Sequence, residues 1–178
     1  MPLPASLKDS LSLPLVAAPM FLISGPELAL ACCQEGIVGS FPALNQRTSE
    51  DFEAWLEQMN DELALFRQQN PETKVAPYAV NLIVHRTNPR WQADMKLCVK
   101  HKVPIIITSL GAASQVVEAV HSYGGVVFHD VTNQKHARKA AEAGVDGIIA
   151  VAAGAGGHAG TINPFVLVHE IREVFDGT

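Results

Sequence analysis

Six short apolar runs, rich in β-branched residues, alternate with longer segments of helical character along the whole chain. The runs predict strands at residues 14–20, 37–41, 78–84, 104–109, 126–129 and 145–151. Successive strands that are separated by helices are expected to lie parallel, because a parallel neighbour requires a crossover connection. The alternation therefore predicts an α/β fold in which helices cover a parallel sheet.

The length of the chain limits how that sheet can close. Eight-unit barrels usually need about 200 to 250 residues or more, whereas this chain has 178 residues. Two architectures remain: an open six-stranded α/β sheet, or the front part of a (β/α) barrel with about six of its eight units. No linker or low-complexity tract divides the sequence, so we expect residues 1–178 to form a single barrel domain that lacks the C-terminal strands.

Capping residues indicate where the helices between these strands begin and end. Thr48 is a typical N-cap for a long amphipathic helix, which the pair Asn70 and Pro71 ends. Thr132 is a candidate cap for the helix that precedes the sixth strand. The predicted helices cover about residues 27–35, 48–70, 88–101, 113–123, 132–143 and 164–174.

Charge and cysteine content exclude several classes of function. The net charge is −5 and no stripe of Lys or Arg is present, which argues against nucleic acid as a partner. No apolar run approaches the length of a membrane span, so we expect no membrane association. Cys32 and Cys33 are neighbours within a predicted helix and are interpreted as buried thiols in a reducing compartment. We therefore expect a cytoplasmic protein that acts on small molecules.

The loop that follows the sixth predicted strand is the strongest functional signal. Residues 152–160 have almost no side chains and include four glycines, more than a helix start requires. Such a loop lets the backbone approach a flat or anionic ligand closely. Within the loop stands His158, which can transfer a proton at neutral pH. Its alternative interpretation is a loop histidine bound to a backbone carbonyl.

Four sequence motifs resemble the nitronate monooxygenase family. They are APM at 18–20, EGIVGS at 35–40, VNL at 80–82, and AEAGVDGIIA at 141–150 followed by AGAGGHAG at 153–160. The resemblance spans nearly the whole chain, and the glycine-rich loop is its most specific part. It implies an FMN-dependent barrel of the TIM type, with the active site at the carboxyl ends of the strands.

The resemblance also implies roles for individual residues. Ala18, Pro19 and Met20 would pack against the flavin, and Asn81 would form a hydrogen bond to it. His158 would serve as base or proton donor beside the flavin. The glycine loop would border the ring and its ribityl chain through Ala155, Gly156, Gly157 and Gly160.

Some of these positions have alternative interpretations or depart from the family. Asp130 is a candidate cofactor contact at a place where relatives often carry Lys, and its charge would disfavour an anionic reduced ring. From the residues alone, Asp130 is better interpreted as a cap for the following helix. Ser109 is either a flavin-edge residue or part of a plain strand-to-helix turn, and the turn is favoured. Asn81 is equally consistent with satisfying backbone groups at a strand end.

The implied activity is an FMN-dependent oxidoreductase that oxidises a nitronate or a similar small substrate with oxygen as acceptor. An NAD(P)H-dependent quinone or enoyl reductase of the same fold would use the same residues. In relatives, loops after strands seven and eight grip the FMN phosphate, whereas this sequence ends at 176–178, where the seventh strand is expected. We therefore expect a truncated or split barrel.

Two alternatives from other classes remain. One is a non-catalytic fragment, stabilised as a homo-oligomer through its exposed sheet edges. The other is a phosphate- or nucleotide-binding module. It is the weaker of the two, because the loop lacks both the Lys-Ser/Thr ending of a P-loop and the spacing of a dinucleotide fingerprint.

Overall fold

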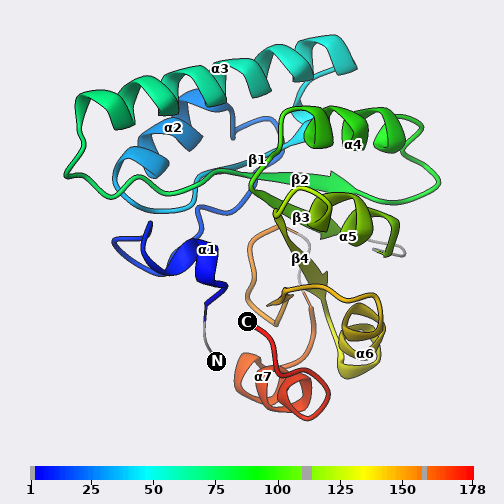
Figure 1. The fold of residues 1–178 in the computed structure, drawn as a ribbon. Coiled ribbons are helices and arrows are strands. Elements are labelled where there is room, and N and C mark those ends of the chain that lie inside the picture. The colour runs from blue at the N-terminus through cyan, green and yellow to red at the C-terminus, as the bar shows by residue number, and fades with distance from the viewer. Residues whose placement is uncertain (1–2, 110–113, 158–159) are drawn as a thin grey trace.

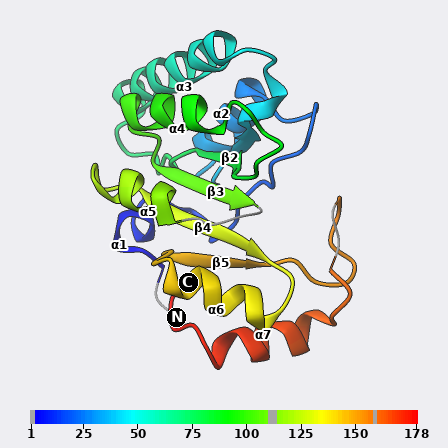
Figure 2. The ribbon, with the colours of Figure 1, turned by 90° about the vertical axis from the view of Figure 1, so that its right-hand side faces the viewer.

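The computed structural model describes residues 3–109, 114–157 and 160–178 and contains a sheet of five parallel strands (Figures 1 and 2). Each strand pairs with the next one in sequence, in the order β1-β2-β3-β4-β5. The strands are β1 (Ser40–Pro42), β2 (Ala79–Ile83), β3 (Ile105–Ser109), β4 (Val126–Val131) and β5 (Gly147–Ala150). The predicted parallel α/β fold is confirmed. Because all strands run the same way, their carboxyl ends share one edge of the sheet.

All helices except the first lie along the outside of the sheet, whereas the first, near the N-terminus, lies against its inner face (Figure 1). They are α1 (Ala5–Lys8), α2 (Pro26–Gln34), the 3-10 turn η1 (Ala43–Asn45), α3 (Ser49–Gln69), α4 (Trp91–Lys100), α5 (Ser114–His121), α6 (Gln134–Glu142) and α7 (Pro164–Arg172). The predicted cap of α3 is confirmed, since the Thr48 side chain accepts a hydrogen bond from the Asp51 amide. The predicted cap of α6 is wrong. Asn133, not Thr132, occupies the N-cap position, and its side chain accepts a hydrogen bond from the amide of His136.

The two faces of the sheet have different coverings, as the alternation of side chains along a strand requires. Val80, Ile106 and Val127 point outward into the core that the helices complete. The neighbouring residues Ile105 and Ile107 point to the inner face, in a smaller apolar cluster. Leu7 of α1 and Leu11, which follows that helix, belong to the same cluster. Its remaining buried members are Val38, Ala76, Ala79, Val126 and Phe128. The inner face is therefore apolar toward the amino ends of the strands.

The first predicted strand, 14–20, is reduced to one bridge between Val16 and Val38. Pro14 and Pro19 cannot donate backbone hydrogen bonds, so a longer ladder cannot form there. The bridge is held by the bonds from the Ala17 amide to the Val38 carbonyl (2.8 Å) and from the Val38 amide to the Leu15 carbonyl (3.1 Å). The prediction of six regular strands was therefore wrong at the first unit, although the segment does lie beside the sheet.

Exposed apolar side chains gather near the two ends of the sheet. One group belongs to the segment that forms the first bridge and the turn after it, and the other to α7, which contacts β5. The exposed residues of these two groups are Leu13, Leu15, Val16, Met20, Phe21, Leu22, Ile23, Phe165, Val166 and Val168. In the described ranges, β5 does not pair with β1 or with the segment before it, so the sheet is open. None of the described helices is both long and apolar enough to cross a membrane.

Candidate active site

Three polar side chains join across neighbouring strands at the carboxyl edge of the sheet. Asn81 on β2 donates from Nδ2 to the Ser109 hydroxyl on β3 at 2.9 Å. Ser109 in turn donates to Oδ2 of Asp130 on β4 at 2.6 Å. The three residues alternate with outward-facing positions, so they share the inner face with Ile105 and Ile107. They form a polar layer above the apolar part of that face.

The orientation of the Asn81 amide follows from its second partner. Nδ2 also donates to the backbone carbonyl of Ile107 at 3.1 Å, and a carbonyl oxygen can only accept. Both amide hydrogens of Asn81 are therefore used, and its Oδ1 has no partner in the described part of the chain. Asn81 is 8% exposed, yet no buried side-chain oxygen of the described residues lacks a hydrogen bond. Oδ1 of Asn81 is therefore not an unsatisfied buried atom.

Asp130 is held in surroundings that favour its neutral form. Burial raises the pKa of its carboxyl above the usual value, and the hydrogen bond from Ser109 opposes that shift in part. The expected capping of the next helix by Asp130 was wrong, because Asn133 occupies the cap and Asp130 accepts from Ser109 instead. A carboxyl group that can hold a proton is thus placed on the inner face.

The segment Ala18–Met20 follows the first bridge and ends in a fixed turn. Asn45 holds the turn: its side chain donates to the carbonyls of Met20 and Ser24 at 3.0 and 2.7 Å and accepts from the amide of Leu22 at 2.9 Å. Leu22 has a φ of 63°, which is unfavourable for a side chain of this size. Ala18 and Met20 are exposed and Pro19 is half-buried. Their surfaces are therefore open to a ligand at this edge.

The glycine-rich loop extends from the carboxyl end of β5, at the edge toward which β3 and β4 also point (Figure 2). Its base is closed by a hydrogen bond from the Ala153 amide to the Ile162 carbonyl at 2.8 Å. A Cβ on Gly160 would lie 2.0 Å from the Val151 carbonyl oxygen, so only glycine fits there. Gly154 has a φ of 88° and open space around it. The backbone of the loop is therefore accessible.

The other predicted residues of this loop lie at its exposed tip. Ala155, Gly156 and Gly157 are exposed, and no atom lies within 4 Å of a Cβ built on either glycine. His158 lies outside the described residues. Among the described residues no hydrogen bond joins the loop to Asn81, so the structure places the predicted site residues at one edge without bringing all of them together.

His129 belongs to the opposite face of β4 and is structural. Its Nδ1 lies 2.7 Å from the hydroxyl oxygen of Thr108. That hydroxyl donates to the Phe128 carbonyl at 3.2 Å. Burial, and secondarily the charge of His136, lowers the pKa of His129. The buried ring is thus kept neutral behind the sheet, away from the inner face.

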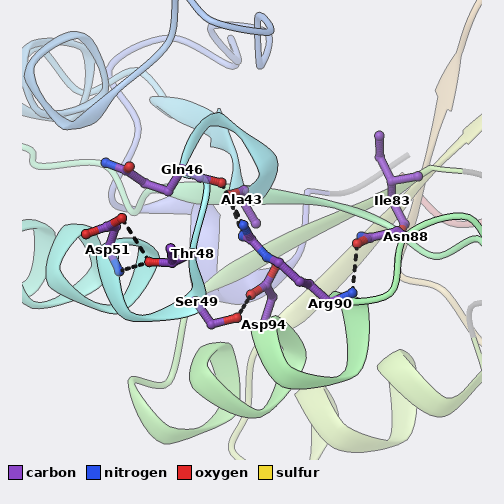
Figure 3. A network of polar contacts seen from close by, with 9 residues as sticks. All are labelled: Ala43, Gln46, Thr48, Ser49, Asp51, Ile83, Asn88, Arg90 and Asp94. Carbon is purple, nitrogen blue, oxygen red and sulfur yellow. Dashed lines mark hydrogen bonds and ion pairs between the residues drawn. The ribbon is translucent and has the colours of Figure 1, made fainter.

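A second polar network secures the loops that leave β1 and β2 at the same edge (Figure 3). Arg90 donates to Oδ2 of the fully buried Asp94 at 3.0 Å and to the carbonyl of Gln46 at 2.8 Å. Ser49, at the start of α3, donates to the other Asp94 oxygen at 2.7 Å. Asn88 accepts from the Arg90 amide at 3.1 Å. These contacts fix the first turns of α3 and α4 relative to the sheet.

Family membership follows from the match to known sequences. The family model described as "Nitronate monooxygenase" matches residues 5–176. The chain belongs to the nitronate monooxygenase family. It is 29% identical to a nitronate monooxygenase of Neurospora crassa over 91% of this chain and 49% of that protein. It therefore spans about half the length of this relative.

Solved structures show the same fold at lower identity. FabK from Thermotoga maritima superimposes with a TM-score of 0.79 at 23% identity, over 97% of this chain and 50% of that one. Nitroalkane oxidase from Streptomyces ansochromogenes gives a TM-score of 0.79 at 20% identity, over 97% of this chain and 59% of that one. These likenesses confirm the barrel-type α/β fold. The expected resemblance to the nitronate monooxygenase family is likewise confirmed.

In this member of the nitronate monooxygenase family, two residues that hold the site together carry no clear signal in the sequence. Ser109 was favoured as a plain turn, yet it links Asn81 to Asp130. Asn45 received no role, yet it fixes the turn after Met20. Both act through partners at least 20 residues away in sequence, so no local pattern could have identified them.

Two other features of the surface lie elsewhere. Glu53, Glu57 and His101 place possible ligand atoms within 4.8 Å of one another on α3 and after α4, and they form the one such group in the described ranges. Glu53 already accepts from Lys100 at 2.7 Å and lies 2.9 Å from His101, which satisfies its charge without a metal.

A cavity of about 200 Å³ lies at the opposite, amino-terminal edge of the strands and is lined by Leu7, Pro77, Lys102, Pro104, Tyr123, Gly124 and Gly125.

Proposed function

We propose that this chain forms the flavin-facing part of an FMN-dependent oxidoreductase that oxidises a nitronate or a similar small substrate with oxygen as acceptor. The observation that supports the proposal best is the carboxyl edge of the sheet. There the amide oxygen of the nearly buried Asn81 has no partner among the described residues, and an accessible glycine-rich backbone lies at the same edge. Membership of the nitronate monooxygenase family supports the same assignment.

The residues of this edge fit a flat cofactor. Open space above Gly156 and Gly157 would let a ring or a ribityl chain lie against the backbone. Asn81 would form a hydrogen bond to the cofactor, and Ala18 to Met20 would pack against it. When bound, FMN supplies the redox chemistry, accepting electrons from the substrate and passing them to oxygen.

The proton chemistry falls to side chains of this chain. We assign His158 as the residue that would move the substrate proton, taking it from the α-carbon of a neutral nitroalkane to give the nitronate, since it stands between the accessible glycines and Gly160 in sequence. Burial on the inner face raises the pKa of Asp130, so its protonated form is favoured more than in an exposed aspartate. General acid–base action of this kind contributes about 10²- to 10⁴-fold in rate.

Anaerobic reduction of bound flavin tests the proposal. The full chain is loaded with FMN, and its reduction by a nitronate is compared with reduction by NADPH in stopped-flow absorbance. Reduction by the nitronate is expected. Reduction by the neutral parent nitroalkane, which must first lose a proton, should be slowed about 10²- to 10⁴-fold in His158→Ala and unchanged in His169→Ala, at an exposed position of α7. Reduction by NADPH alone would favour the quinone or enoyl reductase alternative.

The second candidate function is an assembly subunit that is inactive alone. The exposed apolar groups on the segment 13–23 and on α7 favour it, because large apolar patches usually mark contacts with another protein. Light scattering tests it: colourless oligomers that retain no added FMN would support the subunit, whereas a flavin-bound monomer would refute it. Homo-oligomer formation is part of this candidate alone.

A further inference from the structure

We propose that Asn45 and Arg90 are positioning residues of the candidate site: Asn45 holds the turn 20–24 in one shape, and Arg90 holds Asn45. The turn begins at Met20, which would pack against the ligand, so the consequence for ligand binding rests on the proposed function. The support of the turn itself concerns the chain alone.

The first step is the complete use of the Asn45 amide by one turn. Its Nδ2 donates to the carbonyls of Met20 and Ser24 at 3.0 and 2.7 Å, and its Oδ1 accepts from the amide of Leu22 at 2.9 Å. An asparagine side chain offers two donor hydrogens and an acceptor oxygen, and this turn uses all three. A carboxylate at this place would instead set an oxygen against two carbonyl oxygens.

The second step is the need of the turn for that support. Leu22 has a φ of 63°, in the left-handed region that is unfavourable for a leucine. Phe21 and Leu22 are 65% and 75% exposed, so burial of their side chains does not hold the turn closed. Within the turn, the Ser24 amide donates to the Met20 carbonyl at 3.0 Å, and the Met20 amide donates to Oγ of Ser24 at 2.9 Å. The closed shape therefore depends on hydrogen bonds, and Asn45 supplies three of them.

The third step is the support of Asn45 by Arg90 (Figure 3). Asn45 is the last residue of η1. Arg90 donates from Nη2 to the carbonyl of Ala43 at 3.3 Å, at the start of η1, and from Nη1 to that of Gln46 at 2.8 Å, directly after it. The same guanidinium also donates to the fully buried Asp94 on α4. A chain of contacts thus runs from α4 through η1 to the turn, although the three segments lie far apart in the sequence.

The consequence is an edge of the site that is ordered before a ligand arrives. A ligand that packs against a closed turn does not have to order it, so less binding free energy is lost. Under the proposed function, the segment 18–20 packs against the cofactor. The affinity for the cofactor should therefore depend on Asn45 and Arg90 without either side chain touching it.

Limited digestion with chymotrypsin measures the closed turn without any ligand. Cleavage after Phe21 or Leu22 requires the turn to open, and its rate follows the open fraction when reclosing is fast. Asn45→Asp removes both donor hydrogens at nearly unchanged size, so this cleavage should become about tenfold faster or more. An unchanged rate in Asn45→Asp overturns the role of Asn45.

Two controls confine the effect to the turn. Gln46→Ala is the matched variant, because Gln46 contributes its backbone carbonyl while its side chain points away from Arg90 (Figure 3), and the rate should stay unchanged. Cleavage after the exposed Phe165 on α7 provides a reference rate within each digest. An equal acceleration at both sites in Asn45→Asp would show general destabilisation and would overturn the role of Asn45.

Arg90→Lys tests the support of Asn45 by Arg90. Lysine keeps a positive charge beside Asp94, but one ammonium group does not replace the contacts of the guanidinium with both carbonyls. Cleavage after Leu22 should become about two- to tenfold faster. In a chain that already carries Asn45→Asp, Arg90→Lys should add nothing further, because its effect passes through Asn45. The same fold-change in both backgrounds overturns the role of Arg90.

Fluorescence titration with FMN keeps this inference distinguishable from the proposed function. In Asn45→Asp the dissociation constant of FMN should rise about threefold or more, because only chains with a closed turn bind at full affinity. Val120→Ala removes buried methyl groups from α5, outside this network, and should leave the dissociation constant unchanged. An unchanged value in Asn45→Asp, or an equal rise in Val120→Ala, overturns the positioning role. If the wild type binds no FMN, the proposed function fails, whereas the cleavage rates still decide whether Asn45 and Arg90 hold the turn.

Discussion

Replacing Arg90 with methionine should destabilise the protein strongly, because Arg90 neutralises a carboxylate that has no contact with solvent. Asp94 is fully buried, and Arg90 donates to its Oδ2 from Nη2 and Nε at 3.0 and 3.3 Å. Arg90 also donates to the carbonyls of Gln46 and Ala43 at 2.8 and 3.3 Å. Arg90→Met keeps much of the side-chain volume and removes all of these donors.

The expected loss follows from the burial of the pair. Removing one partner of a buried ion pair costs about 3–5 kcal/mol, because the other charge is left uncompensated. Ser49 still donates to the second oxygen of Asp94 at 2.7 Å, which places the expected loss near the lower end, about 3 kcal/mol. Replacing both partners, in Arg90→Met with Asp94→Leu, should cost less than Arg90→Met alone, because no buried charge then remains.

Urea denaturation followed by far-UV circular dichroism at pH 7 measures these differences. Arg86→Met is the matched control, since Arg86 lies four residues earlier and is exposed, and it should change the unfolding free energy by less than about 0.5 kcal/mol. If Arg90→Met lowers the unfolding free energy by less than about 1 kcal/mol, the pair behaves as a surface ion pair and the reasoning is refuted.

Three further predictions concern single positions. Burial raises the pKa of Asp130, so the unfolded chain loses this proton first as pH rises, and stability falls from about its ordinary pKa of 3.8 upward. Asp130→Asn should therefore be more stable than wild type in urea at pH 7, with the gain shrinking toward pH 4; a constant gain would contradict this origin. Burial lowers the pKa of His129, so the unfolded chain binds this proton more readily and wild-type stability should fall as pH drops below its ordinary value of 6.5. In His129→Gln that part of the fall should be absent, and identical pH profiles would show that His129 does not cause it. Gly160→Ala places a Cβ 2.0 Å from the Val151 carbonyl oxygen and should lower the unfolding free energy by about 1–3 kcal/mol. Gly156 has open space around it, so Gly156→Ala should change the unfolding free energy by less than about 0.5 kcal/mol. Equal effects of the two substitutions in thermal denaturation would contradict the close packing at the base of the loop.

The order of strands and helices was predictable from the sequence because it depends on neighbouring residues. The runs at 78–84 and 104–109 became β2 and β3 nearly as expected, since apolar β-branched residues fit a strand buried on both faces. Thr48 capped α3 and Asn70 ended it for reasons contained within four residues of each site. The glycine-rich loop after the last strand was equally visible, because glycine alone fits the Gly160 position.

Tertiary structure decided how these elements were used. The bridge at Val16 replaced a full strand because prolines and the distant Asn45 govern that segment. The direction of the Asn81 amide depends on the Ile107 carbonyl and on Ser109, which lie 26 and 28 residues away. The sequence determines propensities over a few residues, whereas hydrogen bonds between adjacent strands depend on their register. That register exists only once the chain has folded.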